Sequence, residues 1–161
     1  MIINSTLCYI SRGHEYLLLH RVKKKNDLNH DKWIGFGGKF LDKESPEECV
    51  LREVKEETGL TLTSYRYRGV LTFVSDIWDT EIIHLFTADD FTGELTECSE
   101  GVAEWIDKDV YRSMPMWEGD VLFLDLLEKD EPFFSMKLSY EGDTLVYAAL
   151  NGQTIIDRKK E

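Results

Sequence analysis

The segment from residue 46 to residue 58 is the most narrowly constrained part of this sequence, because it carries signals for both ends of a helix. Ser45 can cap the first turn, and Glu48 stands where it completes a capping box. Pro46 falls at the first helical position, where its missing N–H costs nothing. Gly59 follows the last turn and can adopt positive φ. These signals predict a helix over residues 46–58.

Three glutamates share one side of this predicted helix. Val50 and Val54 form an apolar stripe at about 100° per residue. Carboxylates ~6 Å apart repel each other by roughly 3 kcal/mol per pair at an effective dielectric constant of about 20. On a solvated face, water and salt screen this repulsion and no function follows. In a cleft, the repulsion favours hard cations with oxygen ligands, of which Mg²⁺ is the commonest. The three residues are Glu53, Glu56 and Glu57.

The spacing around the helix distinguishes these two cases. Gly38 is followed after five residues by Glu44, and seven residues later by R-E-V-K-E-E-T-G-L at residues 52–60. Residues 38–60 therefore match G-x5-E-x7-R-E-U-x-E-E-x-G-U, where U is aliphatic, at every specified position. This pattern is the Nudix box, and the chain resembles the Nudix hydrolases.

The resemblance implies a fold of the α/β (α+β) class, formed by a single domain over residues 1–161. That fold is an α/β/α sandwich with a mixed β-sheet. The resemblance also implies hydrolysis of a nucleoside diphosphate linked to another group, with Mg²⁺ as cofactor and Mn²⁺ as an alternative. A cation that bridges phosphate oxygens neutralises their charge and lowers the pKa of a bound water, which agrees with a cluster of glutamates.

The resemblance also assigns roles to the residues of the box. Arg52 would orient the glutamates rather than touch the substrate, and Glu44 would pair with Arg52 or join the outer metal shell. Gly38, or its neighbour Gly37, would lend a backbone carbonyl to the metal. One of the glutamates would activate water through the metal. The catalytic metal ligands would be Glu53, Glu56 and Glu57.

Three segments outside the box look like the MutT/MutX-type and mammalian oxidised-purine triphosphatases. They are W-I-G-F-G-G-K at residues 33–39, W-E-G-D at residues 117–120 and F-F-S at residues 133–135. Those enzymes convert 8-oxo-dGTP to 8-oxo-dGMP and pyrophosphate, which removes oxidised precursors from the nucleotide pool. The resemblance therefore implies this reaction, with a small-molecule nucleotide as the partner.

By the same resemblance, Trp117 would stack on the purine and Asp120 would form a hydrogen bond with its edge. Leu28 and Phe73 would line the pocket, and Glu100 would be a further metal ligand or base. Each role has a structural alternative. Trp117 can be a core residue, Asp120 can be a helix N-cap, and Glu100 can be an ordinary loop charge.

The predicted substrate site also includes two lysines, and it differs from the mammalian enzymes at two positions. Lys39 and Lys23 would contact phosphate, although three consecutive lysines at residues 23–25 are also typical of a solvated loop. The mammalian enzymes have asparagine where Ile34 stands and aspartate where Gly119 stands. Ile34 and Gly119 offer no side-chain hydrogen bond, so this chain must distinguish the base differently from the mammalian enzymes. The form W-E-G-D favours the MutX-type branch.

The rest of the chain alternates short apolar runs with turns. Residues 21–31 predict an exposed loop, and residues 107–112 and 120–128 predict helices. Residues 141–143 predict a hairpin turn. Strands thus outnumber helices, which favours a mixed-sheet α/β or α+β sandwich. The predicted strands cover residues 7–10, 16–20, 66–75, 81–88, 102–106, 133–140 and 144–150.

Composition excludes several classes of protein. The net charge of −12 argues against binding to a nucleic-acid duplex, and it requires cations or local basic groups wherever an anionic nucleotide binds. No apolar window is long enough for a membrane helix, and the N-terminus lacks the features of a signal peptide. Cys8, Cys49 and Cys98 form no C-x-x-C pair, and the four histidines show no zinc spacing. Buried free thiols and a cytoplasmic location are therefore expected. The sequence does not determine the oligomeric state, and a monomer is favoured.

Two other functions stay open. The chain can be a Nudix hydrolase of another substrate, such as an undamaged dNTP, a dinucleoside polyphosphate or ADP-ribose. It can also be a non-catalytic nucleotide sensor, although such domains usually lose glutamates of the box and none is lost here.

Overall fold

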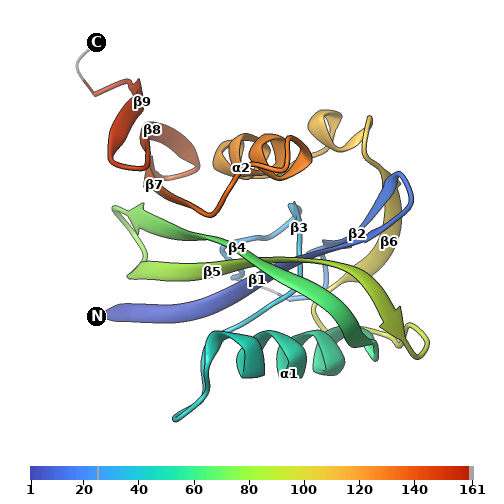
Figure 1. Cartoon of the computed structure of the whole chain (residues 1–161). Coiled ribbons are helices and arrows are strands. Elements are labelled where there is room, and N and C mark those ends of the chain that lie inside the picture. The colour runs from blue at the N-terminus through green and yellow to red at the C-terminus, as the bar shows by residue number, and fades with distance from the viewer. Residues whose placement is uncertain (25, 160–161) are drawn as a thin grey trace.

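The computed structural model describes residues 1–24 and 26–159, and these residues form a mixed sheet with a helix on each face (Figure 1). The strands follow the order β3-β2-β1-β5-β4-β7-β8-β9, and β6 pairs with the other edge of β2. The pairs β1–β5 and β4–β7 are parallel, and the remaining pairs are antiparallel. The elements are β1 (Ile2–Arg12), β2 (Glu15–His20), β3 (Trp33–Ile34), α1 (Pro46–Thr58), β4 (Thr61–Ser75), β5 (Thr80–Thr92), β6 (Val102–Asp107), η1 (Tyr111–Ser113), α2 (Glu118–Glu128), β7 (Phe134–Glu141), β8 (Thr144–Leu150) and β9 (Gln153–Asp157).

The sheet is buried on both faces because its central strands carry apolar side chains on both faces. In β1, Tyr9 belongs to the core under α2, whereas its neighbours Cys8 and Ile10 belong to the core under α1. In β5, Leu85 and Phe86 divide in the same way. This division follows from the period of two along a strand. The two cores confirm the predicted α/β/α sandwich.

Helix α1 begins and ends at the residues that the sequence predicts. The Ser45 side chain accepts a hydrogen bond from the backbone N–H of Glu48, and the Glu48 side chain accepts one from the backbone N–H of Ser45. Gly59 ends the helix with φ of 80°. Val50 and Val54 are fully buried against the sheet. The orientation of the helix is therefore fixed by its caps and by its apolar stripe.

Residues 33–40 enter the space where β1 and β2 separate. The backbone N–H of Phe36 donates to the carbonyl of Cys8, and that of Cys8 donates back to Phe36. The backbone N–H of Thr6 donates to the carbonyl of Gly38 at 2.9 Å. A Cβ atom at Gly37 would lie 1.9 Å from the Thr6 carbonyl oxygen, so only glycine permits this approach. The segment thereby places Gly37 and Gly38 beside the glutamates of α1.

Two sequence predictions need correction, and β9 has no counterpart among the predicted strands. Residues 107–112 form no α-helix, because Asp107 ends β6 and only the short 3₁₀ turn η1 follows. The Asp107 carboxylate accepts the backbone N–H of Asp109 at 2.7 Å, which stabilises a turn instead. Strand β9 was not predicted, since its residues are largely exposed and lack the apolar alternation of a buried strand. Residues 21–31 are not uniformly exposed, because Arg21 is buried.

The prediction of buried free thiols is confirmed within the described residues. Cys8, Cys49 and Cys98 are free and buried. No helix there is both long enough and apolar enough to cross a membrane.

Candidate active site

One large cavity of about 910 Å³ joins the glutamate face of α1 to the start of α2. Its lining comes from β1, the loop after β2, the segment at residues 34–41, α1, β4, β5 with the turn before it, the loop before β6, α2 and β7. Two residues of the predicted site, Arg52 and Lys23, are not part of this lining. The lining includes the predicted residues Leu28, Gly38, Lys39, Glu53, Glu56, Glu57, Phe73, Glu100, Trp117 and Asp120.

Arg52 contacts three of the carboxylates from the side of α1. Its Nε and Nη2 atoms donate to the two oxygens of Glu44 at 2.6 and 2.9 Å. Its Nη1 atom donates to Glu53 at 2.8 Å and to Glu56 at 3.2 Å. The bidentate bond from Arg52 lowers the pKa of Glu44 to about 2. Arg52 thus holds Glu53 and Glu56 beside the cavity without lining it.

Glu57 is the most enclosed carboxylate of the box. Its Oε1 atom accepts the backbone N–H of Gly37 at 2.9 Å. Burial raises the pKa of Glu57 to about 8, and the charges of Glu100 and Glu53 add to the rise. Negative charge at this end of the cavity is therefore incompletely compensated by the protein.

Gly37 and Gly38, at the start of the box, differ in the direction of their backbone groups. The carbonyl of Gly38 accepts from the backbone of Thr6 and from the Cys49 thiol, so it faces β1 and α1. Gly37 donates its N–H to Glu57, and the N–H and C=O of one residue in an extended segment point the same way. This geometry favours Gly37 over Gly38 as the residue whose carbonyl faces the carboxylates.

Glu100 reaches the cavity from the loop before β6 and bonds to Arg21. Arg21 Nη1 donates to Glu100 Oε2 at 2.8 Å, and Arg21 Nε donates to Asp27 Oδ2 at 2.7 Å. Sequence reasoning missed both Arg21 and Asp27, because they lie in a polar stretch that predicts an exposed loop. No local signal marks them, since Glu100 is distant along the chain.

Trp117 is placed at the opposite, apolar end of the cavity. It is only 6% exposed, and its ring meets Phe73 and Tyr140 at nearly right angles. Its Nε1 atom donates to Asn29 Oδ1 at 2.7 Å, and the Lys32 ammonium lies 4.4 Å from its ring centroid. Trp117 is therefore part of the core and also part of the cavity wall.

Asp120 lies in the third position of α2, so it is not the N-cap; Trp117 holds that position, and its side chain forms no capping hydrogen bond. The Asp120 side chain lines the cavity. Burial raises its pKa to about 8, although the nearby Lys32 opposes the rise. A carboxyl group with such a pKa is mostly protonated at neutral pH, and it can then donate as well as accept a hydrogen bond.

Gly119 has a structural reason to replace the aspartate of the mammalian enzymes. Its backbone N–H donates to the Tyr140 hydroxyl at 2.8 Å. A Cβ atom there would lie 2.7 Å from that hydroxyl and 2.7 Å from a methyl carbon of Leu138. A larger residue would therefore displace the side chains of Leu138 and Tyr140. Ile34, the other departure, lines the cavity with an apolar side chain.

The two predicted phosphate-binding lysines are placed differently. Lys39 lines the acidic end of the cavity, and its carbonyl accepts a bond from Arg52. Lys23 instead donates to Glu97 at 3.1 Å and to the carbonyl of Cys98 at 3.0 Å. Its neighbour Lys24 lines the cavity.

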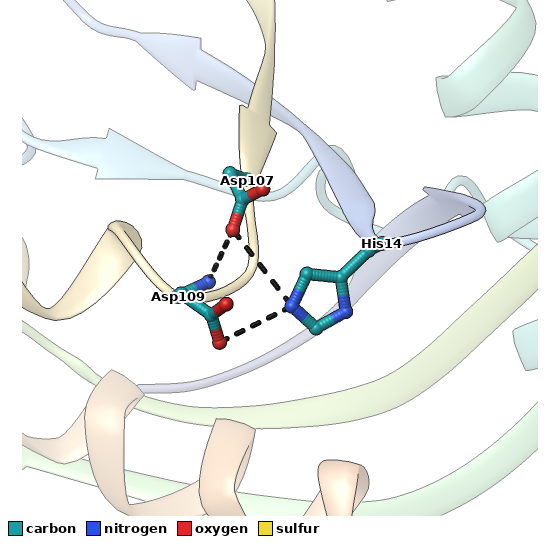
Figure 2. A group of neighbouring side chains, drawn as sticks. All are labelled: His14, Asp107 and Asp109. Atoms are coloured by element: carbon teal, nitrogen blue, oxygen red, sulfur yellow. Dashed lines mark hydrogen bonds and ion pairs between the residues drawn. The ribbon is translucent and has the colours of Figure 1, made fainter.

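A second acidic cluster lies outside the cavity (Figure 2). His14 Nε2 lies 3.1 Å from Asp109 Oδ1 and 3.8 Å from Asp107 Oδ1, and all three residues are exposed. Sequence spacing gave no hint of it, because His14 follows β1, whereas Asp107 ends β6 and Asp109 comes two residues later. Exposed ion pairs of this kind contribute little to stability, and no function is assigned to the cluster.

Comparison with known proteins agrees with the fold and with the box. The family model described as the NUDIX domain matches residues 1–127. The oxidized purine nucleoside triphosphate hydrolase of Danio rerio is 36% identical over 125 residues, which cover 76% of this chain and 79% of that protein. The uncharacterized Nudix hydrolase YvcI of Bacillus subtilis (strain 168) is 29% identical over 140 residues, which cover 84% of this chain and 85% of that protein.

A solved structure is similar over nearly the whole chain. The crystal structure of a mutator MutT protein from Bacillus halodurans superposes with a TM-score of 0.82 at 27% identity. The match covers 94% of this chain and 99% of that one. The sandwich, the intact box and the family match together identify this chain as a member of the Nudix hydrolase family.

Proposed function

We propose that this chain is a divalent-cation-dependent hydrolase of purine nucleoside triphosphates, and that its substrate is 8-oxo-dGTP, which it converts to 8-oxo-dGMP and pyrophosphate. The observation that carries the proposal is one continuous cavity with carboxylates at one end and an aromatic wall at the other. A nucleotide has the matching distribution, with phosphates at one end and a planar base at the other. The name of the Danio rerio relative, an oxidized purine nucleoside triphosphate hydrolase, supports the same substrate class.

The acidic end fits a hard divalent cation. Its donors are carboxylate oxygens, which Mg²⁺ and Mn²⁺ prefer, and the four predicted glutamate ligands all line this one cavity. When bound, the ion would supply charge neutralisation at the phosphates and a water of lowered pKa. The residues that would hold it are Glu53, Glu56, Glu57, Glu100 and a backbone carbonyl of Gly37 or Gly38.

The chain's own residues would orient and discriminate the substrate. Arg52 fixes Glu53 and Glu56 by direct hydrogen bonds, so these carboxylates need little reorganisation when a substrate binds. Lys39 lies where it would attract phosphate. Trp117 and Phe73 would contact the base, and a protonated Asp120 would donate to an acceptor on the purine edge.

The decisive experiment is turnover of 8-oxo-dGTP and dGTP with Mg²⁺ and with EDTA, followed by identification of the products. We expect 8-oxo-dGMP and pyrophosphate with Mg²⁺, preference for the oxidised nucleotide, and no turnover in EDTA. Equal turnover of both nucleotides would reject the preference for the oxidised base. Faster turnover of ADP-ribose or a dinucleoside polyphosphate would assign another substrate, and no turnover of any of them would favour a nucleotide sensor. We further propose a monomer with a single domain over residues 1–161, located in the cytoplasm.

A further inference from the structure

We propose that Arg21 is a positioning residue that couples the acidic end of the cavity to its base-binding end through a relay of hydrogen bonds. The relay consists of Glu100, Arg21, Asp27, Asn29 and Trp117, and all five residues line the cavity. The inference rests on the proposed function for its kinetic consequences. Its structural consequence can be measured without any turnover.

The relay is continuous from carboxylate to indole. Arg21 bonds to Glu100 at 2.8 Å with Nη1 and to Asp27 at 2.7 Å with Nε. The second oxygen of Asp27 accepts the backbone N–H of Asn29 at 3.1 Å. The side-chain oxygen of Asn29 accepts the indole N–H of Trp117 at 2.7 Å. Each residue in the path therefore fixes the next one.

Burial strengthens the hydrogen bonds of Arg21 in this relay. The side chains of Arg21 and Asp27 are 11% and 6% exposed, whereas that of Glu100 is 34% exposed. Charged hydrogen bonds that are shielded from water are stronger than surface ion pairs. A movement of Glu100, at the more exposed end of the relay, would therefore displace the buried pair of Arg21 and Asp27.

The backbone on both sides of Arg21 is also fixed. Its N–H donates to the carbonyl of Lys32 at 3.0 Å, and its carbonyl accepts the N–H of Asp31 at 2.7 Å. These bonds close the base of the loop that carries Asp27 and Asn29. Movement of the Arg21 side chain would consequently act on the loop contacts rather than on β2.

The guanidinium group suits this role because it presents two N–H groups in a fixed geometry. A lysine at residue 21 would keep the charge but would offer a single ammonium group, which would not hold Glu100 and Asp27 in the same relation. Glu100 and Glu57 both line the cavity. Without the bond to Arg21, Glu100 would not be held in its place in the cavity wall.

The test follows the indole N–H signal of Trp117 by NMR during a titration with Mg²⁺ alone. The chain has four tryptophans, and Trp117→Phe identifies the signal. In the wild type, Mg²⁺ should shift the Trp117 signal, while the signal of Trp105, which packs on Arg12 and Phe91, stays constant. In Arg21→Lys the Trp117 shift should fall at least threefold.

The control is Arg68→Lys, which alters another buried arginine bonded to an aspartate, Asp130, away from the cavity. This variant should keep the wild-type response to Mg²⁺. Asn29→Ala, which interrupts the relay at a second place, should lose the response as Arg21→Lys does. The proposal would be overturned if the wild-type Trp117 signal did not shift with Mg²⁺, or if it shifted equally in Arg21→Lys and the wild type.

Kinetics provide the second readout. Arg21→Lys should lower kcat and raise KM, each by about threefold to tenfold, because it disturbs both ends of the cavity. Asn29→Ala should raise KM and leave kcat within about twofold, since it disturbs the base end alone. If both variants change only KM, the coupling through Arg21 is wrong. Absence of turnover in the wild type would instead reject the proposed function, and the NMR titration would still decide the relay.

Discussion

The carboxylate of Glu53 packs directly against the Cα atom of Gly38. A Cβ atom built at Gly38 would lie 2.5 Å from the Glu53 carboxylate carbon and 2.7 Å from each of its oxygens. A Cβ atom makes no contact closer than about 3.0 Å, so any side chain at residue 38 must displace Glu53. The glycine of the Nudix box thus has a steric role beside the carboxylates, whichever glycine carbonyl faces the metal.

Gly38→Ala should therefore reduce kcat/KM for the preferred nucleotide by about 10²-fold, which corresponds to ~2.7 kcal/mol of transition-state stabilisation. The fold should survive, because the clash involves the end of a side chain. Gly13→Ala is the matched control: Gly13 lies in the β1–β2 turn with φ of 57° and open space around its Cα. It should lose about 1 kcal/mol of stability and keep its activity. Equal kinetic losses in the two variants would refute the steric role.

Glu57→Gln should cost about 10²-fold or more in kcat, because it removes a negative charge from the acidic end while keeping the shape of the side chain. The glutamine oxygen can still accept the N–H of Gly37, so folding should be preserved. Glu47→Gln, an exposed glutamate on the first turn of the same helix, should behave as the wild type. Steady-state kinetics over a series of Mg²⁺ concentrations measures both. Wild-type turnover by Glu57→Gln, or by any form in EDTA, would reject the metal mechanism.

Trp117→Ala should affect both stability and substrate binding, because the indole is buried and also lines the cavity. We expect about 3 kcal/mol lower stability, from the void left in the core. We also expect KM to rise by roughly tenfold or more, from the loss of ~1–3 kcal/mol of stacking on the base. Trp105→Ala is the control, since Trp105 packs on Arg12 outside the cavity. Melting curves and KM should be measured on the same preparations. A constant KM together with a lower stability would contradict the stacking role.

Asp120→Asn should change the preference between 8-oxo-dGTP and dGTP more than the turnover of either, since the asparagine amide keeps the size of the side chain but replaces the single O–H donor by an NH₂ group with two donors. The ratio of the two kcat/KM values should change by about tenfold. An unchanged ratio would mean that Asp120 does not contact the base.

The same variant should alter the pH dependence of stability. Asp120 has a pKa of about 8 in the folded protein against an ordinary value of 3.8, so the folded state binds the proton more tightly. The free energy of unfolding should therefore fall as the pH rises from about 4 to about 8. At pH 9 in EDTA, Asp120→Asn should be more stable than the wild type by about 2 kcal/mol, which is roughly 4–8 °C in Tm. Water that enters the cavity reduces the effect below the full value of the pKa shift. Parallel melting curves at pH 5 and pH 9 would show instead that Asp120 titrates normally.

Sequence by itself determined α1 and the contacts within the box. The caps at Ser45 and Gly59 and the contacts of Arg52 with Glu53 and Glu56 join residues at most four apart. Such interactions depend on helical geometry alone, so spacing is sufficient to predict them. The mixed sheet also followed from the pattern, because strands outnumbered helices and the family resemblance gave their layers.

Tertiary structure alone decided how the two ends of the cavity are joined. Arg21 meets Glu100 across 79 positions of the sequence, and Asn29 meets Trp117 across 88. Neither contact has a local signature, because each depends on where β2, the loop before β6 and α2 converge. The choice of Lys24 rather than Lys23 as a cavity residue, and the requirement for Gly119 beside Tyr140, arise in the same way. A residue's neighbours along the chain fix its local conformation, whereas its role in the cavity depends on groups that only the folded chain brings within bonding distance.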